Sequence, residues 1–285
     1  MTEPKLGYIG LGNQGAPMAK RLVDWPGGLT VFDVRTDAMT PFAELGASVA
    51  EDVAAVSAAD VISVTVLNDA QVREVVGELG EHARPGTVIA IHSTIEPGTA
   101  GELAEKLRPK GVHVVDAPVS GGAAAAEKGE LAVMVGADDE AYDKVKPVFK
   151  QWASMVVRAG EPGAGTRMKI ARNMLTFIGF AAACEAQKLA EAAGIDLQKL
   201  GRVVRHSDAQ SGGPGAIMAR DDTKPLAPDH FLHDMFVHTR GLAEKDLRLA
   251  LGLGVATGVE LPLAEIALRD LAAGLGVPHT ADTKE

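Results

Sequence analysis

The sequence predicts two domains of different class, an α/β domain over residues 1–162 and an all-α domain over residues 163–285. In the first half of the chain, short β-branched segments alternate with segments of helical spacing. This alternation is typical of a mostly parallel sheet that is covered by helices on both faces. Beyond residue 160 the alternation stops, and only segments with helical spacing follow. The predicted domain boundary lies at this change.

Seven apolar, β-branched segments are the predicted strands of the first domain. They are 6–9, 29–33, 61–67, 87–91, 112–116, 131–135 and 155–157. Several are apolar at every position, as strands are when both faces of the sheet are buried. Helical spacing lies between most of them, for example over 16–23 and 99–107. The order of elements predicts a doubly wound α/β domain.

The second domain is predicted to begin with one long helix over 166–193. Gly194 is a typical stop signal, and Asp196 is a typical start signal for the next helix. The long helix is apolar on most faces through its middle, so we expect it to be buried in a core or between subunits. The single cysteine, Cys184, lies in this apolar stretch and is expected to be a small core residue. Further helices are predicted over 197–206, 239–253 and 262–275.

Composition excludes several classes of function. The chain has 285 residues and a formal net charge of −10, which argues against nucleic-acid binding and against binding to an anionic membrane surface. A single cysteine permits no disulfide framework and suits a reducing compartment. The N-terminus has no signal-peptide pattern, and no apolar stretch is long enough to span a bilayer. We therefore expect a cytoplasmic protein with a small-molecule ligand.

A glycine-rich turn follows the first predicted strand. Gly10, Gly12 and Gly15 form the pattern G-x-G-x-x-G, directly after 6–9 and directly before a helix. The first glycine permits the tight turn, the second lets the backbone approach a pyrophosphate, and the third lets helix and strand pack closely. The second strand ends at Asp33, where a carboxylate can accept hydrogen bonds from a ribose hydroxyl. The sequence therefore predicts a Rossmann dinucleotide-binding domain.

Two residues at the end of the second strand bear on the choice of dinucleotide. Asp33 favours NAD, because a carboxylate repels a 2′-phosphate. Arg35 stands two residues further on, and its guanidinium could cover either a 2′-phosphate or the adenine ring. We expect NAD, with NADP as the alternative.

Two further patterns lie later in the chain. Lys169 and Asn173 are four residues apart near the start of the long helix, hence on one face of it, after a glycine-rich loop over 160–165. A second loop, 116–122, follows a predicted strand, and its Ser120-Gly-Gly122 part could bind a carboxylate with backbone N–H groups. Taken alone, the first pattern is also compatible with a surface lysine beside a linker, and the second with an ordinary turn.

Together these motifs resemble the β-hydroxyacid dehydrogenase family, and most closely its 3-hydroxyisobutyrate dehydrogenase branch. The resemblance covers nearly the whole chain. It rests on five motifs that occur in the family's order, which are Gly10-Leu-Gly-Asn-Gln-Gly-Ala-Pro-Met18, Ser93-Thr-Ile-x-Pro97, Asp116-Ala-Pro-Val-Ser-Gly-Gly122, Gly160-x-x-Gly-x-Gly-x-x-x-Lys-x-x-x-Asn173 and Lys245-Asp-Leu-x-Leu-Ala250.

The resemblance implies a role for each matching residue. Lys169 is expected to be the catalytic general acid and base, and no metal is expected. Substrate binding is assigned to Ser120, Gly121, Gly122 and Asn173. The cofactor is expected to contact Gly10, Leu11, Gly12, Asn13, Gln14, Gly15, Asp33, Arg35, Leu67, Asn68, Thr94 and Lys245.

The implied activity is hydride transfer between NAD(P) and a small 3-hydroxy acid such as 3-hydroxyisobutyrate, in a homodimer or homotetramer. Asn68 stands where the family often has proline, and residues 207–237 match no known substrate-specifying region, so the substrate stays open. One alternative is a small semialdehyde reductase, which keeps the lysine. Imine reductases of this fold generally lack it, so Lys169 disfavours that activity. The other alternative is a non-catalytic dinucleotide-binding protein, which retention of Lys169 and Asn173 disfavours.

Overall fold

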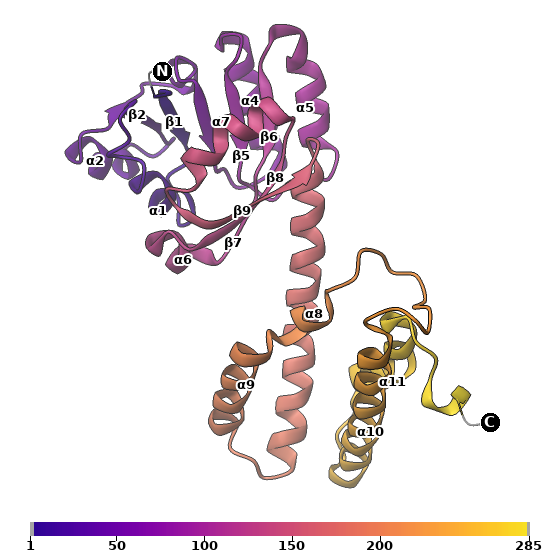
Figure 1. The fold of residues 1–285 in the computed structure, drawn as a ribbon. Coiled ribbons are helices and arrows are strands. Elements are labelled where there is room, and N and C mark those ends of the chain that lie inside the picture. Colours follow the sequence, from indigo (N-terminus) through magenta and orange to yellow (C-terminus); the bar gives the residue numbers. More distant parts are fainter. Residues whose placement is uncertain (1–2, 284–285) are drawn as a thin grey trace. The chain divides into compact units, whose positions relative to one another are not determined.

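The computed structural model describes residues 3–283 (Figure 1). The chain divides into two compact units, and the division falls between Met174 and Leu175. This position lies inside the longest helix, α8 (Ala164–Ala192). The first unit therefore contains the α/β domain together with the first turns of α8.

The first unit is built on a sheet of nine described strands. Six of them follow the order β3-β2-β1-β4-β5-β6 and are parallel. β8 continues the sheet antiparallel to β6 and carries β7 and β9. The strand bounds are β1 (Leu6–Ile9), β2 (Leu29–Phe32), β3 (Ser48–Val49), β4 (Val61–Val64), β5 (Val88–Ile91), β6 (His113–Asp116), β7 (Val119–Ser120), β8 (Leu131–Gly136) and β9 (Ala153–Gly160). The predicted mostly parallel sheet is confirmed.

Helices cover both faces of this sheet, because successive strand residues point to opposite sides. In β5, Val88 and Ala90 belong to one buried cluster, and Ile89 and Ile91 belong to the other. The first cluster is closed by α1 (Gly15–Lys20), α2 (Thr36–Glu44), α6 (Gly122–Lys128) and α7 (Asp139–Phe149), and the second by α3 (Val53–Val56), α4 (Asp69–His82) and α5 (Thr99–Leu107). A short 3₁₀ helix, η1 (Arg108–Lys110), follows α5.

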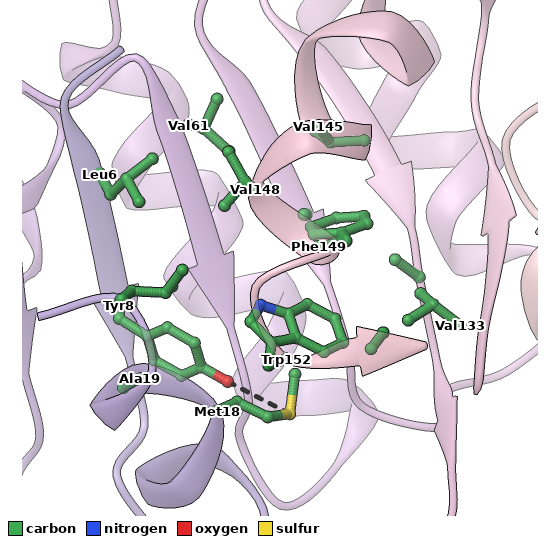
Figure 2. Packing of buried hydrophobic residues seen from close by; sticks show 14 of the residues in the cluster. Leu6, Tyr8, Met18, Ala19, Val61, Val133, Val145, Val148, Phe149 and Trp152 are labelled. Carbon is green, nitrogen blue, oxygen red and sulfur yellow. Dashed lines mark hydrogen bonds between the residues drawn. The ribbon is translucent and has the colours of Figure 1, made fainter. Parts of the chain in front are cut away.

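The first cluster contains the largest buried side chains of the molecule. Trp152 and Phe149 are fully buried and pack together with a ring-centroid distance of 5.1 Å. Figure 2 shows them beside Tyr8 and Met18, whose hydroxyl and sulfur atoms are 3.6 Å apart. Burying aromatic rings of this size stabilises a domain by about 1.5–3 kcal/mol each. The sheet edge that carries the site therefore rests on a well-packed core.

In the part that the structure describes, the second unit contains helices and connecting loops but no strand. It contains the rest of α8, then α9 (Leu197–Ser211), η2 (Gly213–Ile217), α10 (His233–Thr257), α11 (Pro262–Leu275) and η3 (Thr280–Thr283). Its described core is small and is formed by Leu232, Phe236, Leu275 and Val277. The predicted all-α character is confirmed, whereas the boundary at residue 162 stays a prediction. Within the described residues, no helix combines the length and apolar character needed to cross a membrane.

The long helix differs from its prediction in one respect. Only Gly165 and Thr166 of α8 are buried, and the apolar middle of the helix is exposed. Cys184 is exposed as well, so its assignment as a core residue was wrong. Local sequence sets how apolar a helix is, but not which partner covers it. The expectation that this helix is buried is therefore not met by the described chain itself.

Candidate active site

The site is organised by the carboxyl ends of four neighbouring parallel strands. Ile9 of β1, Val64 of β4, Ile91 of β5 and Asp116 of β6 lie in one row across the sheet. The loop after each of these strands carries residues that the sequence assigns to a site. Ligands bind at this edge in open α/β sheets, because the loops there converge around a crevice. The structure thus brings four separate loops, each with predicted site residues, to one edge.

Two glycines of the glycine-rich turn are required because a side chain at either position would collide with the protein's own backbone. Gly10 has a φ of 93°, and a Cβ atom there would collide with the carbonyl oxygen of Thr65. A Cβ atom on Gly15 would collide with the carbonyl oxygen of Gly10. Gly12 is different, because a Cβ atom there would meet nothing within 4 Å. Packing does not explain a glycine at position 12, whereas close approach by a pyrophosphate does. The turn therefore fits a dinucleotide.

Asp33 is buried directly behind this turn. One carboxylate oxygen accepts a hydrogen bond from the backbone N–H of Leu11 at 2.7 Å, and the other accepts from the backbone N–H of Arg35 at 2.9 Å. The Arg35 side chain also donates from Nε at 3.3 Å. Asp33 is thus a clamp between the glycine-rich turn and the end of β2, in addition to any contact that it makes with a ribose.

A cleft of about 960 Å³ opens beside the glycine-rich turn. Its lining includes Leu11, Gly12, Asn13 and Arg35. Helices α1 and α2 supply most of the remaining wall. Four of the predicted cofactor residues therefore line one cleft, which has the size range of small-molecule sites.

The loops after β4 and β5 are joined by one hydroxyl group. Ser93 Oγ donates to the carbonyl oxygen of Val66 at 2.6 Å and accepts from its N–H at 3.0 Å. Leu67 is 90% exposed beside this junction, and Thr94 is exposed as well. The Asn68 side chain accepts from the N–H of Gln71 and so caps α4. Leu67 and Thr94 are free to contact a ligand, whereas Asn68 already has a structural partner.

Lys169 reaches the Ser120 loop from helix α8. Its Nζ atom donates to the carbonyl oxygen of Val119 at 2.6 Å and to Ser120 Oγ at 3.0 Å. Burial lowers the pKa of Lys169 below its usual value, and the positive charge of Arg172 lowers it further. The structure thus brings together the predicted catalytic lysine and the predicted carboxylate-binding loop.

For Asn173 and Lys245, the described part of the chain shows no side-chain hydrogen bond to another predicted site residue. Asn173 is partly buried on α8, one turn beyond Lys169 and within the same unit. Lys245 lies on α10 in the second unit, where its ammonium is 3.2 Å from Asp246. Its expected position near the cofactor stays a prediction.

Three structural features of the site were missed by sequence reasoning. Asp116 accepts two backbone N–H bonds from the start of α8. His92 is buried between Ser63 Oγ and the carbonyl oxygen of Ala117. Ser93 joins the two loops just described. Asp116 and Ser93 lie in motifs that the sequence analysis identified. Their hydrogen-bond partners are distant in the chain, and local sequence patterns do not predict such partners.

Two family models cover almost the entire chain. Residues 5–160 match the model described as the NAD binding domain of 6-phosphogluconate dehydrogenase. Residues 163–282 match the model described as NAD-binding of NADP-dependent 3-hydroxyisobutyrate dehydrogenase. The predicted nicotinamide dinucleotide cofactor is therefore confirmed at the level of the family.

Individual proteins agree with this assignment. The chain is 66% identical, over 97% of its length and 95% of the relative's, to an uncharacterised oxidoreductase of Mycobacterium tuberculosis. It is 36% identical, over 94% of its length and 88% of the relative's, to L-threonate dehydrogenase of Escherichia coli. A solved structure of a putative oxidoreductase from Mycobacterium avium is 69% identical over 97% of this chain and all of that one, with a TM-score of 0.94.

The resemblance found in the sequence is thus confirmed, as are the fold class and the assignment as an enzyme. The alternative of a non-catalytic dinucleotide-binding protein is set aside, because the relatives of this chain include dehydrogenases. The chain belongs to the β-hydroxyacid dehydrogenase family, among the oxidoreductases related to 3-hydroxyisobutyrate dehydrogenase.

Proposed function

We propose that the protein transfers a hydride between NAD and a small 3-hydroxy acid such as 3-hydroxyisobutyrate, with Lys169 as the general acid and base. One observation carries the proposal. The Lys169 amine is partly buried and lies 3.0 Å from Ser120 Oγ, at the sheet edge that also bears the glycine-rich turn. A proton carrier therefore stands beside the loop proposed to hold a carboxylate.

The residues of the site have separate roles in this proposal. Ser120, Gly121 and Gly122 bind the substrate carboxylate, and Asn173 binds the substrate from the next turn of α8. A base must lie within hydrogen-bond reach of the hydroxyl that loses its proton. The lowered pKa of Lys169 raises the neutral fraction of its amine, so it can accept that proton. The nicotinamide, when bound, supplies the hydride acceptor.

The same site serves the reverse reaction. A charged Lys169 donates its proton to a carbonyl oxygen as that oxygen becomes an alkoxide. The hydrogen bond from Nζ to Val119 O already has the amine acting as a donor. A small semialdehyde is therefore the alternative substrate, and the assay must run in both directions.

NAD is proposed as the preferred cofactor. Asp33 places a buried negative charge at the end of β2, which disfavours a 2′-phosphate. Arg35 lines the cleft, but its guanidinium is 3.3 Å from Asp33 and so is partly neutralised. We expect Asp33→Asn to lower the ratio of kcat/KM for NAD to that for NADP. An unchanged or higher ratio would contradict the assignment.

The central experiment is an absorbance screen for formation and loss of the reduced nicotinamide. It crosses NAD and NADP with 3-hydroxyisobutyrate, 3-hydroxypropionate, glycerate, L-serine, L-threonine and 4-hydroxybutyrate, and it includes the matching carbonyl compounds in reverse. Loss of a general acid and base typically lowers a rate about 10²- to 10⁴-fold. We expect Lys169→Ala to lower kcat by that factor with the best substrate.

A matched control lies on the same helix. Lys188 is exposed on α8 in the second unit, so Lys188→Ala removes an ammonium without touching the site. We expect it to keep the parental kcat. If Lys169→Ala also stayed within about threefold of the parent, the proposed role of the lysine would be wrong.

We further propose that the enzyme is a homodimer or a larger homo-oligomer. Phe177, Ile178 and Phe180 on α8 are between 54% and 63% exposed in the single chain. A helix that is apolar on most faces is normally covered, and a second copy of this chain is the proposed cover. Light scattering coupled to size exclusion should give at least twice the monomer mass, and Phe177→Glu should lower it. A monomer mass for the unmodified protein would refute this proposal.

A further inference from the structure

Asp116 ends strand β6 with a carboxylate that is completely buried. Its oxygens accept backbone N–H bonds from Gly163 at 2.6 Å and from Thr166 at 2.5 Å. Gly163 directly precedes α8 and Thr166 lies in its first turn, about fifty residues further along the chain. N–H groups at the start of a helix have no partner within the helix, so a carboxylate satisfies them and favours that end of the helix dipole. Asp116 therefore attaches the start of α8 to the sheet.

The neighbouring chain is shaped to permit this attachment. A Cβ atom on Gly136 of β8 would collide with the Asp116 carboxylate. A Cβ atom on Gly165 would collide with the carbonyl oxygen of Met134 and lie 2.7 Å from that of Asp116. The helix begins so close to the strands that a side chain at either glycine would push it away. The close contacts at Gly136 and Gly165 thus fix the position of the first turn of α8 against the strands.

The same stretch of chain holds α8 a second time. Val119 and Ser120 follow Asp116 by three and four residues, and both accept hydrogen bonds from Lys169 Nζ. Lys169 follows Thr166 by three residues, which is a rise of about 4.5 Å along the helix. The segment 116–120 is itself fixed, because the N–H of Ala117 bonds to Ile91 O and Val119 pairs with Val133. Helix and loop are therefore joined at two points one turn apart.

We propose that Asp116 is a positioning residue for the reaction, which acts by fixing the first turn of α8 so that the Lys169 amine stands at Ser120. This inference rests on the proposed role of Lys169. It predicts an effect on catalysis that is separate from dinucleotide binding, because the cleft beside the glycine-rich turn is lined by other loops. A misplacement of about 1 Å can lower a rate about 100-fold.

The test is a double-mutant cycle with Asp116→Asn and Lys169→Ala, assayed with NAD and 3-hydroxyisobutyrate or the fastest acid of the screen. Asparagine keeps the size of the side chain but presents an NH₂ group to one of the two N–H donors. We expect Asp116→Asn to lower kcat about 100-fold with an unchanged KM for NAD and an unchanged Kd for NADH by fluorescence. In the Lys169→Ala background we expect it to change the residual rate less than twofold.

Two measurements separate positioning from general stabilisation. Hydrogen–deuterium exchange should become faster in peptides that cover residues 160–170 and should stay unchanged around the glycine-rich turn. The matched control is Asp52→Asn, because Asp52 also accepts a helix N–H, from Ala55 at 2.7 Å, but at the start of α3. This variant should keep the parental kcat at a temperature where it is folded.

The outcomes are distinct. Equal fold losses in the parent and in the Lys169→Ala background, or a KM for NAD that rises as kcat falls, would overturn the inference. A Lys169→Ala enzyme with parental activity would instead overturn the proposed function. If Asp116→Asn does not fold, Asp116→Glu keeps both acceptors but lengthens the side chain by one methylene. It must then lower kcat without changing the KM for NAD, and a parental kcat would overturn the inference.

Discussion

Replacing His92 should remove a large part of the acid sensitivity of the first unit. The imidazole is completely buried at the end of β5, with Nδ1 2.8 Å from the carbonyl oxygen of Ala117 and Nε2 3.0 Å from Ser63 Oγ. The Ala117 oxygen can only accept, so Nδ1 carries the proton and Nε2 accepts from the hydroxyl. Phe149 and Trp152 pack edge-on against the ring. Burial among these groups disfavours a second proton on the ring.

The size of the effect follows from the pKa. Burial lowers the pKa of His92 from 6.5 to about 4, although the bond to Ala117 O opposes this. Below pH 6.5 the unfolded chain takes up a proton that the folded chain refuses until the pH approaches 4. The stabilisation is therefore complete above pH 6.5 and is lost as the pH falls toward 4. One pKa unit corresponds to about 1.4 kcal/mol, so about 2 kcal/mol of unfolding free energy should be lost between pH 7.5 and 5.

Tryptophan fluorescence provides the assay, because both tryptophans, Trp25 and Trp152, belong to the first unit. Urea unfolding is followed at pH 7.5, 6.5, 5.5 and 5.0 for the parent and for His92→Gln, which cannot titrate. Carboxylates contribute an acid dependence that both proteins share, so the difference between the two curves isolates the histidine. The parent should lose about 2 kcal/mol more than the variant over this range. Parallel curves for the two proteins would refute the reasoning.

Two further predictions concern backbone contacts. Gly12→Ala should keep the parental thermal unfolding, because the added Cβ meets no protein atom within 4 Å, but should weaken NADH binding at least tenfold by fluorescence titration. Gly10→Ala should lower the melting temperature, because its Cβ would collide with Thr65 O. If Gly12→Ala bound NADH with the parental affinity, the proposed dinucleotide contact at Gly12 would be contradicted. Glu185 accepts backbone N–H bonds from Leu263 at 3.0 Å and Ala264 at 2.9 Å, so it caps α11 from α8. Glu185→Ala should lower the unfolding free energy by about 1 kcal/mol in a circular-dichroism melt, and an unchanged melt would exclude the cap.

The elements that sequence reasoning located best are those whose burial follows a simple period. Helices α5 (Thr99–Leu107) and α11 (Pro262–Leu275) begin and end where the pattern predicts. Strands buried on both faces were found because most of their residues are apolar. The two-residue strands β3 and β7 were missed, since two residues are too few to show a period. Helix α10 begins at His233, six residues before its predicted start at residue 239.

The site could be predicted as a set of motifs but not as a set of contacts. The pairing of Lys169 with Ser120 joins residues 49 apart, and the pairing of Asp116 with Thr166 joins residues 50 apart. Local pattern can indicate that each motif is unusual, because glycines and a lone lysine stand out near a predicted strand end or helix start. Which motif faces which depends on strand order, and strand order follows from packing over the whole sheet.

Buried carboxylates show why chemical type alone does not assign a role. The buried Asp33 and Asp116 and the partly buried Glu185 could each be interpreted from the sequence as a ligand-binding or acid–base group. Each accepts two backbone N–H groups, and at least one of the two comes from a distant segment of the chain. A buried carboxylate is costly unless hydrogen bonds satisfy it, so these bonds are the condition for its presence. Of the three, only Asp33 borders the glycine-rich turn. The proposed preference for NAD therefore depends on a charge that the fold already holds in place, and we expect a change at Asp33 to alter turn geometry and cofactor choice together.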